Sequence, residues 1–175
     1  MIRDAVLADL PSIVEIYNST IASRLVTADT EPVAIASRVP WFEAHSSDRH
    51  PLWVLTQDLA RNSTPAINQD QEILGWLSLS AFYGRPAYQS TVEISLYVAP
   101  HCRRQGVGKQ LLTHVLEASP RMQIEILLGF IFAHNQPSLN LFTSYGFQSW
   151  GYLPQVAELD DIKRDLVILG LRLES

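Results

Sequence analysis

The chain has 175 residues, of which 47% are apolar, and a formal net charge of −5. This length suits one domain with a substantial core, and the apolar fraction excludes a disordered chain. The acidic charge disfavours general nucleic-acid binding, and no apolar run reaches the roughly 18 to 20 residues of a membrane span. The N-terminus lacks a signal-peptide pattern, and the sequence has one cysteine, Cys102. We therefore expect a cytoplasmic protein without an internal disulfide and without a nucleic-acid or membrane partner.

The hydrophobic pattern predicts one mixed α/β domain over residues 1–175, without an internal repeat or boundary. Alternating or continuous apolar runs predict strands, and apolar residues at helical spacing predict helices. The first expected elements are a strand at 2–3, a helix from Asp9 to 21, and a helix that starts at 31–32 and ends before Pro51. Strands at 52–56 and 72–80 follow, separated by a polar loop at 58–71, and then an aromatic-rich connection at 82–88, a strand at 91–98, a glycine turn and a helix to 116. The last expected elements are a strand at 124–132, a short helix from Asn135 to Gly146, and strands at 147–153 and 166–173.

The glycine turn joins the strand at 91–98 to the next helix. Its sequence, Arg103-Arg104-Gln105-Gly106-Val107-Gly108-Lys109, combines two glycines with three cations. A helix N-terminus carries unpaired N–H groups and a partial positive charge, and glycine lets the backbone approach a ligand closely. The turn therefore predicts a cradle for a pyrophosphate. The alternative is a helix cap that contains glycines by chance.

Two common nucleotide-binding motifs do not fit this turn. A Walker P-loop would need glycine at Arg103 and serine or threonine at Gln110, and a Rossmann fingerprint would need its third glycine at Leu111. The spacing therefore disfavours a nucleoside-triphosphate or dinucleotide site.

The turn and its surroundings resemble the GNAT N-acetyltransferase superfamily. The pattern Q/R-x-x-G-x-G/A runs from Arg103 to Gly108, and a second pattern, Asn135-x-x-Ser138-x-x-Leu141-Phe142-x-x-x-Gly146-Phe147, follows it. Tyr88-x-x-Thr-Val-Glu93-x-Ser95-x-Tyr97-Val98 is similar to the phosphinothricin and methionine sulfoximine acetyltransferase branch. The resemblance implies a single-domain GNAT fold, with a mixed, mostly antiparallel sheet of about six to seven strands flanked by about four helices. It also implies transfer of an acetyl group from acetyl-CoA to a small amine, such as an amino acid or an analogue.

The resemblance further implies how acetyl-CoA would be held. The turn would bind the pyrophosphate, the backbone of Leu96 and Val98 would pair with the pantetheine arm, and Asn135 and Ser138 would approach that arm. The implied cofactor-binding residues are Leu96, Val98, Arg103, Arg104, Gly106, Val107, Gly108, Lys109, Asn135 and Ser138. Asn135 is also a plausible N-cap on structural grounds, and both roles can hold.

Glu93 is the predicted catalytic base. Strand alternation places it on one face with Thr91, Ser95 and Tyr97. A carboxylate inside an otherwise apolar strand is costly to bury without a partner, and burial raises its pKa toward the range useful for a base. The resemblance places the base of this branch at the same position. The alternative is a structural ion pair between Glu93 and Arg85 or another cation at the sheet edge.

The acceptor pocket is expected from the segment 25–30 and from the aromatic connection, with Phe82, Arg85 and Tyr88 as substrate-binding residues. Arg85 could pair with a substrate carboxylate, and the alternative is an exposed loop arginine.

The sequence departs from the resembled proteins at two places. Many of them carry a tyrosine acid where this chain has Phe142, and Tyr145 lies three residues later. A thiol with a pKa of about 8.5 can also leave as a thiolate. The branch tends to carry a Trp-His-Asp triplet near the C-terminus, where this chain has Lys163-Arg164-Asp165.

The five histidines show no metal-ligand spacing, so no metal site is predicted, and Cys102 is interpreted as a structural or incidental thiol. Two other functions stay open: a CoA-binding sensor without catalysis, and a protein or peptide N-acetyltransferase. Members of the resembled branch often form dimers, and Trp150-Gly-Tyr152 could supply apolar surface for a homodimer.

Overall fold

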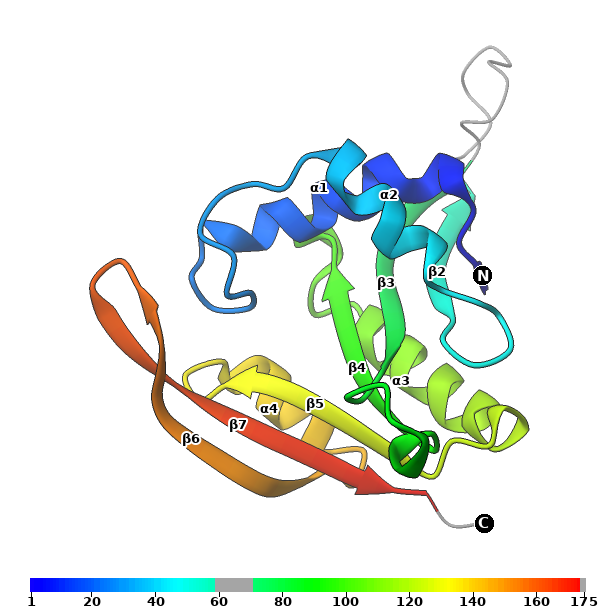
Figure 1. The fold of residues 1–175 in the computed structure, drawn as a ribbon. Coiled ribbons are helices and arrows are strands. Elements are labelled where there is room, and N and C mark those ends of the chain that lie inside the picture. Colours follow the sequence, from blue (N-terminus) through cyan, green and yellow to red (C-terminus); the bar gives the residue numbers. More distant parts are fainter. Residues whose placement is uncertain (59–70, 174–175) are drawn as a thin grey trace.

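Seven strands form one mixed sheet in the order β1-β2-β3-β4-β5-β7-β6 (Figure 1). The computed structural model describes residues 1–58 and 71–173, so the predicted polar loop at 58–71 lies almost entirely outside the described residues. Neighbouring strands pair antiparallel except β4 and β5, which pair parallel. The strands are β1 (Ile2–Asp4), β2 (Leu52–Asp58), β3 (Gln71–Ala81), β4 (Thr91–Val98), β5 (Ile126–Phe132), β6 (Gln148–Leu159) and β7 (Ile162–Arg172).

Four α-helices accompany the sheet in the described part of the chain: α1 (Leu10–Ile21), α2 (Ile35–Glu43), α3 (Val107–Ala118) and α4 (Gln136–Thr143). Short 3-10 turns lie at Leu7–Asp9, Pro86–Tyr88, Pro100–Cys102 and Ser119–Met122. The predicted α/β fold, with a mixed and mostly antiparallel sheet, is confirmed. Within the described ranges, no helix is long and apolar enough to cross a membrane.

Helices α1 and α2 cover one face of the sheet at β3 and β4, and α3 covers the other face (Figure 1). On one face the rings of Tyr97 and Trp76 contact α1 and α2, with Tyr17 5.1 Å from Tyr97 and Trp41 5.8 Å from Trp76. On the other face a Cβ added to Gly75 would lie 2.9 Å from the side chain of Val107. The start of α3 therefore packs directly on the sheet, at a position where only glycine leaves room.

The second helix begins later than predicted. The pattern places its start at 31–32, but α2 begins at Ile35. The backbone N–H of Val33 donates to Asn18 Oδ1 at 2.9 Å, and Asn18 Nδ2 donates to the carbonyl of Val33 at 3.0 Å. These two bonds hold the α1–α2 connection against α1 at Val33, so α2 begins only after this residue.

The parallel pair β4 and β5 is short. It joins Thr91, Val92 and Glu93 to Ile126, Leu127 and Leu128, and the register ends there. Beyond Glu93 the two strands diverge, as Figure 1 shows. The edge of β4 that faces β5 is therefore left without a strand partner over Ile94–Val98, while its other edge stays paired with β3.

Candidate active site

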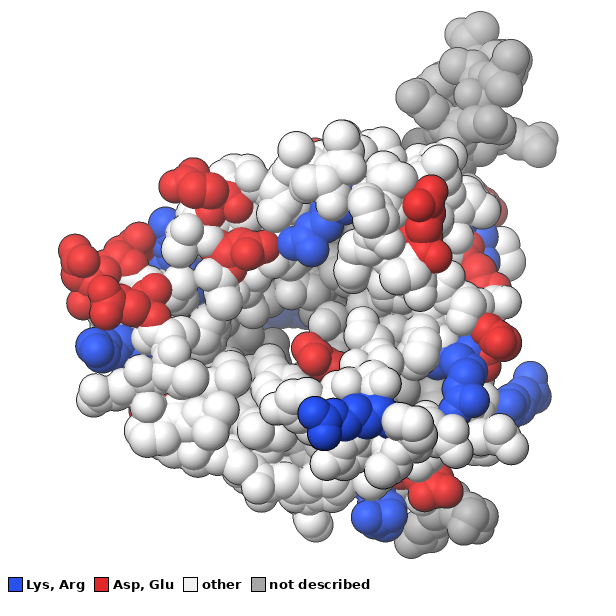
Figure 2. All heavy atoms as spheres, viewed as in Figure 1, with Lys and Arg blue, Asp and Glu red and all other residues white. Residues whose placement is uncertain are grey.

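A cavity of about 220 Å³ lies where α1 and α2 cover β3 and β4. Figure 2 shows this face of the molecule, hollowed between the helical layer and the strands, with acidic and basic side chains around the opening. The cavity is small enough to suit a small molecule rather than a protein segment. Its lining residues are Ile13, Val14, Tyr17, Val33, Arg38, Trp41, Trp76, Ser78, Ser80, Glu93, Ser95 and Tyr97.

Glu93 lines this cavity, and its backbone is opposite Ser80 on β3. The Glu93 side chain is half-buried, and it forms no ion pair with any of the described residues. The predicted alternative, an ion pair with Arg85, is therefore not formed. Burial raises the pKa of the Glu93 carboxyl above its ordinary value. An unpaired carboxylate with a raised pKa in a cavity is a suitable proton acceptor.

Three rungs of the β3–β4 ladder form the base of the cavity. Glu93 is opposite Ser80, Ser95 opposite Ser78, and Tyr97 opposite Trp76. We call Ser78, Ser80 and Ser95 the serine floor. Since a strand rises roughly 3.3 Å per residue, the Cα atoms of Glu93 and Tyr97 are about 13 Å apart. The floor thus lies between a carboxylate at one end and an aromatic group at the other.

Aromatic rings close the second end of the cavity. Trp76 stacks on Tyr97 with ring centroids 4.4 Å apart, and the indole of Trp41 meets Trp76 edge to face. Trp76 Nε1 donates to the carbonyl of Ile13, which fixes the indole against α1. Burial raises the pKa of the Tyr97 hydroxyl well above its ordinary value, so this residue stays neutral. The arrangement gives a rigid apolar wall.

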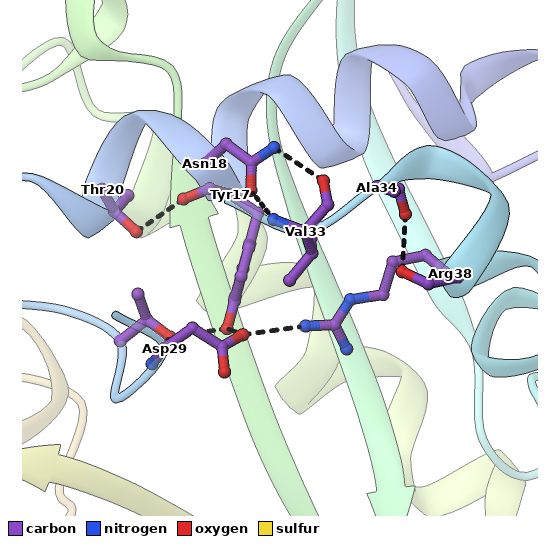
Figure 3. Close-up of polar contacts among 9 residues, drawn as sticks. Tyr17, Asn18, Thr20, Asp29, Val33, Ala34 and Arg38 are labelled. Atoms are coloured by element: carbon purple, nitrogen blue, oxygen red, sulfur yellow. Dashed lines mark hydrogen bonds and ion pairs between the residues drawn. The ribbon is translucent and has the colours of Figure 1, made fainter. Parts of the chain in front are cut away.

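A cation from α2 also lines the cavity. Arg38 Nη2 donates to Asp29 Oδ2 at 3.1 Å, and the guanidinium carbon lies 5.0 Å from the centroid of the Tyr17 ring (Figure 3). Tyr17 Oη donates to the same carboxylate oxygen at 2.5 Å. Burial and this bond raise the pKa of Tyr17. Sequence analysis missed Arg38; its only signal was its place one helical turn before Trp41.

The predicted acceptor residues do not line the cavity. Phe82, Tyr83 and Tyr88 contact one another, with Phe82 and Tyr88 centroids 5.4 Å apart, and Arg85 is exposed. Of the predicted segment 25–30, Thr27 is buried behind the cavity wall and hydrogen-bonds Tyr17. The rings of the aromatic connection contact one another, and Tyr83 and Tyr88 remain exposed.

The glycine turn begins α3 as predicted. Gly106 has φ +85°, in the left-handed region where glycine is favoured, and α3 starts at Val107. The first amides of the helix have no carbonyl one turn earlier to bond. Arg103, Arg104 and Lys109 are exposed, and none of them forms an ion pair within the described residues. The turn thus offers free N–H donors and free cations to an anion.

The remaining predicted cofactor residues lie close to this turn. Leu96 and Val98 are on the part of β4 whose edge is unpaired toward β5. A Cβ added to Gly108 would lie 2.8 Å from the Leu141 side chain of α4, so the N-terminal half of α3 contacts α4. Asn135 is the N-cap of α4, and its Oδ1 accepts from the Ser138 N–H at 3.2 Å. The cap explains Asn135 structurally and leaves its cofactor role a prediction.

Tyr145, which lies three residues after the position of the missing tyrosine acid, does not line the cavity. Phe142 is buried against Phe147. Tyr145 Oη donates to the carbonyl of Lys109 at 2.9 Å and lies 3.0 Å from the Thr113 hydroxyl, both on α3. Asp165 accepts from Tyr152 Oη and from the Gln155 N–H on the β6–β7 ribbon. Tyr145 therefore does not supply the missing hydroxyl to the cavity, and the tyrosines that line it are Tyr17 and Tyr97.

One group of possible metal ligands lies beside the turn. The ligand atoms of Glu72, His101 and Cys102 are within 4.8 Å of one another, and His101 Nε2 is 2.6 Å from Glu72 Oε1. Burial, followed by the charge of Glu72, raises the pKa of the Cys102 thiol. A protonated, buried thiol behaves as a structural residue.

Comparison with known proteins agrees with this geometry. Residues 30–147 match the profile of the Acetyltransferase (GNAT) family. The chain belongs to this family and is an N-acetyltransferase.

Within the family, the chain is similar to the phosphinothricin and methionine sulfoximine acetyltransferase branch. It is 47% identical to YwnH of Bacillus subtilis, whose name assigns it to the phosphinothricin acetyltransferases, over 94% of each chain. It is 31% identical to an L-methionine sulfoximine/L-methionine sulfone acetyltransferase of Pseudomonas paraeruginosa, over 99% of this chain and 94% of that protein. The crystal structure of a phosphinothricin acetyltransferase from Sinorhizobium meliloti in complex with acetyl-CoA superposes with a TM-score of 0.84 at 26% identity, over 99% and 88% of the two chains.

Proposed function

We propose that this protein transfers the acetyl group of acetyl-CoA to the amine of a small acceptor, an amino acid or an amino acid analogue. The observation that carries the proposal is Glu93: an unpaired carboxyl with a raised pKa, lining a cavity beside the point where β4 leaves β5. The relatives named for phosphinothricin and for methionine sulfoximine support an acceptor of this size and chemistry.

The residues around the turn suit acetyl-CoA as the acyl donor. The α3 N-terminus, with Arg103, Arg104 and Lys109, would bind the pyrophosphate. The unpaired edge of β4 at Leu96 and Val98 would bond the amides of the pantetheine arm as an added strand would. The donor supplies an activated acetyl thioester, and the acetyl-CoA in the Sinorhizobium meliloti structure supports this choice.

Glu93 would act on the acceptor. It removes a proton from the ammonium group, so that the neutral nitrogen can attack the acyl carbon. The serine floor hydroxyls line the cavity and hydrogen-bond the acceptor. Backbone N–H groups of β4 next to Glu93 are the available donors for the negative charge that develops on the carbonyl oxygen. The thiol can leave as a thiolate and take its proton from water.

Two alternatives make different predictions. A CoA-binding sensor would bind the cofactor without turnover, and a protein or peptide N-acetyltransferase would need a groove long enough for a chain segment. The aromatic end formed by Trp41, Trp76 and Tyr97 favours a small acceptor over a peptide.

The direct test is turnover. The protein is incubated with acetyl-CoA and a panel of α-amino acids, L-methionine sulfoximine and phosphinothricin, while thiol release is recorded and the acetylated product is identified by mass spectrometry. We expect an N-acetylated amino acid and thiol in equal amounts. Binding of acetyl-CoA without any acetylated amine would support the sensor, and acetylation of peptides alone would support a peptide acetyltransferase.

We also propose a cytoplasmic homodimer formed through the β6–β7 ribbon. Its exposed apolar side chains are Trp150, Tyr152, Leu153, Val156 and Ile162. Val156 is 55% exposed, so Val156→Lys leaves the fold intact while placing a charge in the contact. Sedimentation equilibrium is expected to show a dimer for the wild type and a monomer for this variant; a monomeric wild type would contradict the proposal.

A further inference from the structure

Three side chains of metal-binding types meet directly before the glycine turn. They are the carboxylate of Glu72, the imidazole of His101 and the thiol of Cys102, and their ligand atoms all lie within 4.8 Å of one another. None of the three lines the cavity that contains Glu93. The cluster is therefore separate from the candidate active site, and the steps proposed for acetyl transfer do not use it.

Backbone hydrogen bonds bring the two segments of the cluster together. The N–H of Ala99 donates to the carbonyl of Leu74 on β3 at 2.9 Å, and the N–H of Cys102 donates to the carbonyl of Ala99 at 2.9 Å. These bonds hold His101 and Cys102 next to the first residues of β3, where Glu72 lies. The three ligands are thus brought together by the fold itself, before any ion binds.

The spacing of the ligand atoms is close to that of a zinc site. His101 Nε2 lies 2.6 Å from Glu72 Oε1. Zinc binds thiolate sulfur at about 2.3 Å and imidazole nitrogen or carboxylate oxygen at about 2.0 to 2.2 Å, so two ligand atoms of a tetrahedral ion are about 3.5 Å apart. The ligand atoms therefore need to shift by about 1 Å to enclose the ion. The side chains of His101 and Glu72 are 63% and 40% exposed and have room for this shift.

The combination of ligands selects the kind of ion. A thiolate and an imidazole favour zinc, whereas Mg²⁺ and Ca²⁺ prefer oxygen ligands alone. The thiol of Cys102 would release its proton to the solvent when the ion binds. The thiolate and the carboxylate of Glu72 then balance the two charges of the ion, so the occupied site carries no net charge beside the apolar core. Water would take the fourth position of the tetrahedron.

We propose that Glu72, His101 and Cys102 bind a zinc ion, which ties the residue before the glycine turn to β3. The ion stabilises the fold and has no part in the proton transfer assigned to Glu93, so the zinc site and the proposed function stand or fall separately. The alternative is a hydrogen bond between His101 and Glu72 beside a core cysteine. Sequence spacing did not reveal the site, because Glu72 is 29 residues from His101.

The test measures zinc binding by the full-length protein without an affinity tag. Isothermal titration with zinc chloride is expected to show one ion per chain and a Kd of about 1 µM, weaker than for sites with four protein ligands. Zinc at about a hundredfold above this Kd should raise the unfolding midpoint by about 5 to 10 °C. Mg²⁺ at the same concentration should leave the midpoint unchanged.

Substitutions distinguish the cluster from unspecific metal binding. Cys102→Ser, His101→Gln and Glu72→Gln should each weaken zinc binding by at least about tenfold. The last two variants change exposed side chains, so they test the site even if Cys102→Ser fails to fold. The matched control is His50→Gln, which removes a histidine outside the cluster and should bind zinc as the wild type does. In a parallel titration, Co²⁺ should give the charge-transfer absorption of a cobalt–thiolate bond, which reports Cys102 directly.

Four results would overturn the inference. They are a wild type that binds zinc no more tightly than about 100 µM; zinc binding that is unchanged in His101→Gln or Glu72→Gln; a loss in His50→Gln as large as in His101→Gln; and a cobalt complex without the thiolate absorption. Any of them would leave the cluster as a hydrogen bond next to a buried thiol. None of these measurements depends on acetyl transfer, so a failure of the proposed function does not affect them.

Discussion

Replacing Glu93 with glutamine is expected to lower kcat for acetyl transfer by about 10² to 10⁴-fold, the usual contribution of a positioned base. Glutamine keeps the size and the hydrogen-bonding capacity of the side chain but cannot accept the proton of the amine. The Kd of acetyl-CoA should not change, because the turn and the free edge of β4 are intact. The matched control is Glu158→Gln on β6, an exposed strand glutamate outside the cavity.

The pH dependence gives a second readout of the same variant. Because burial raises the pKa of Glu93, the acid limb of the kcat/KM profile should lie at higher pH than for an exposed glutamate. The rate falls as pH drops through this pKa, since a protonated carboxyl is not a base. The limb that belongs to Glu93 should be absent in Glu93→Gln.

Stability should change in the opposite direction to activity. The pKa of Glu93 is higher in the folded protein than in the unfolded chain. Protonation of this carboxyl therefore stabilises the fold at pH values below the unfolded pKa. The stabilisation is lost as pH rises through the folded pKa. Glu93→Gln should therefore be more stable than the wild type at neutral and higher pH and equally stable at low pH.

A variant with unchanged kcat would show that Glu93 is not the base.

Neutralising the cations of the turn should affect the donor rather than the chemistry. Replacement of Arg103, Arg104 and Lys109 together by glutamine is expected to raise the KM for acetyl-CoA about a thousandfold, or about tenfold for each charge-assisted bond to phosphate. At saturating acetyl-CoA, kcat should change little, because Glu93 and the cavity are untouched. Added salt should weaken acetyl-CoA binding to the wild type and have little effect on the variant.

The control for this experiment removes the same number of positive charges elsewhere. Arg121, Lys163 and Arg172 are exposed and lie outside the turn, so their replacement by glutamine should leave the KM for acetyl-CoA within about twofold of the wild type. If the two triple variants had the same KM, binding would depend on overall charge, and the turn would not be the pyrophosphate site.

Local sequence rules predicted the parts of the site that lie within one element. Alternation along β4 placed Glu93 on one face with Ser95 and Tyr97, because residues two apart share a face, and the family resemblance assigned the base to this position. The turn was found because Gly106 and its neighbouring cations are consecutive, and α3 starts at Val107 as the spacing indicates. The cap by Asn135 was predicted from residue type alone and is confirmed.

Features that depend on contacts between distant segments were missed. The cavity role of Arg38 requires α2 to be placed over β3, and this placement depends on the bonds between Asn18 and Val33. The divergence of β4 and β5 depends on the register between two strands far apart in the sequence. Conversely, the aromatic connection at 82–88 was expected to meet the acceptor because it is aromatic, but its rings pack on one another.

The most direct test of the account is a crystal structure of the protein with CoA and an amino acid acceptor bound together. We expect the pyrophosphate at the N-terminus of α3, the pantetheine arm between β4 and β5, and the acceptor amine within hydrogen-bonding distance of Glu93. An acceptor bound outside this cavity, for example at Phe82, Arg85 and Tyr88, or a CoA arm that does not enter the gap between the strands, would contradict the account.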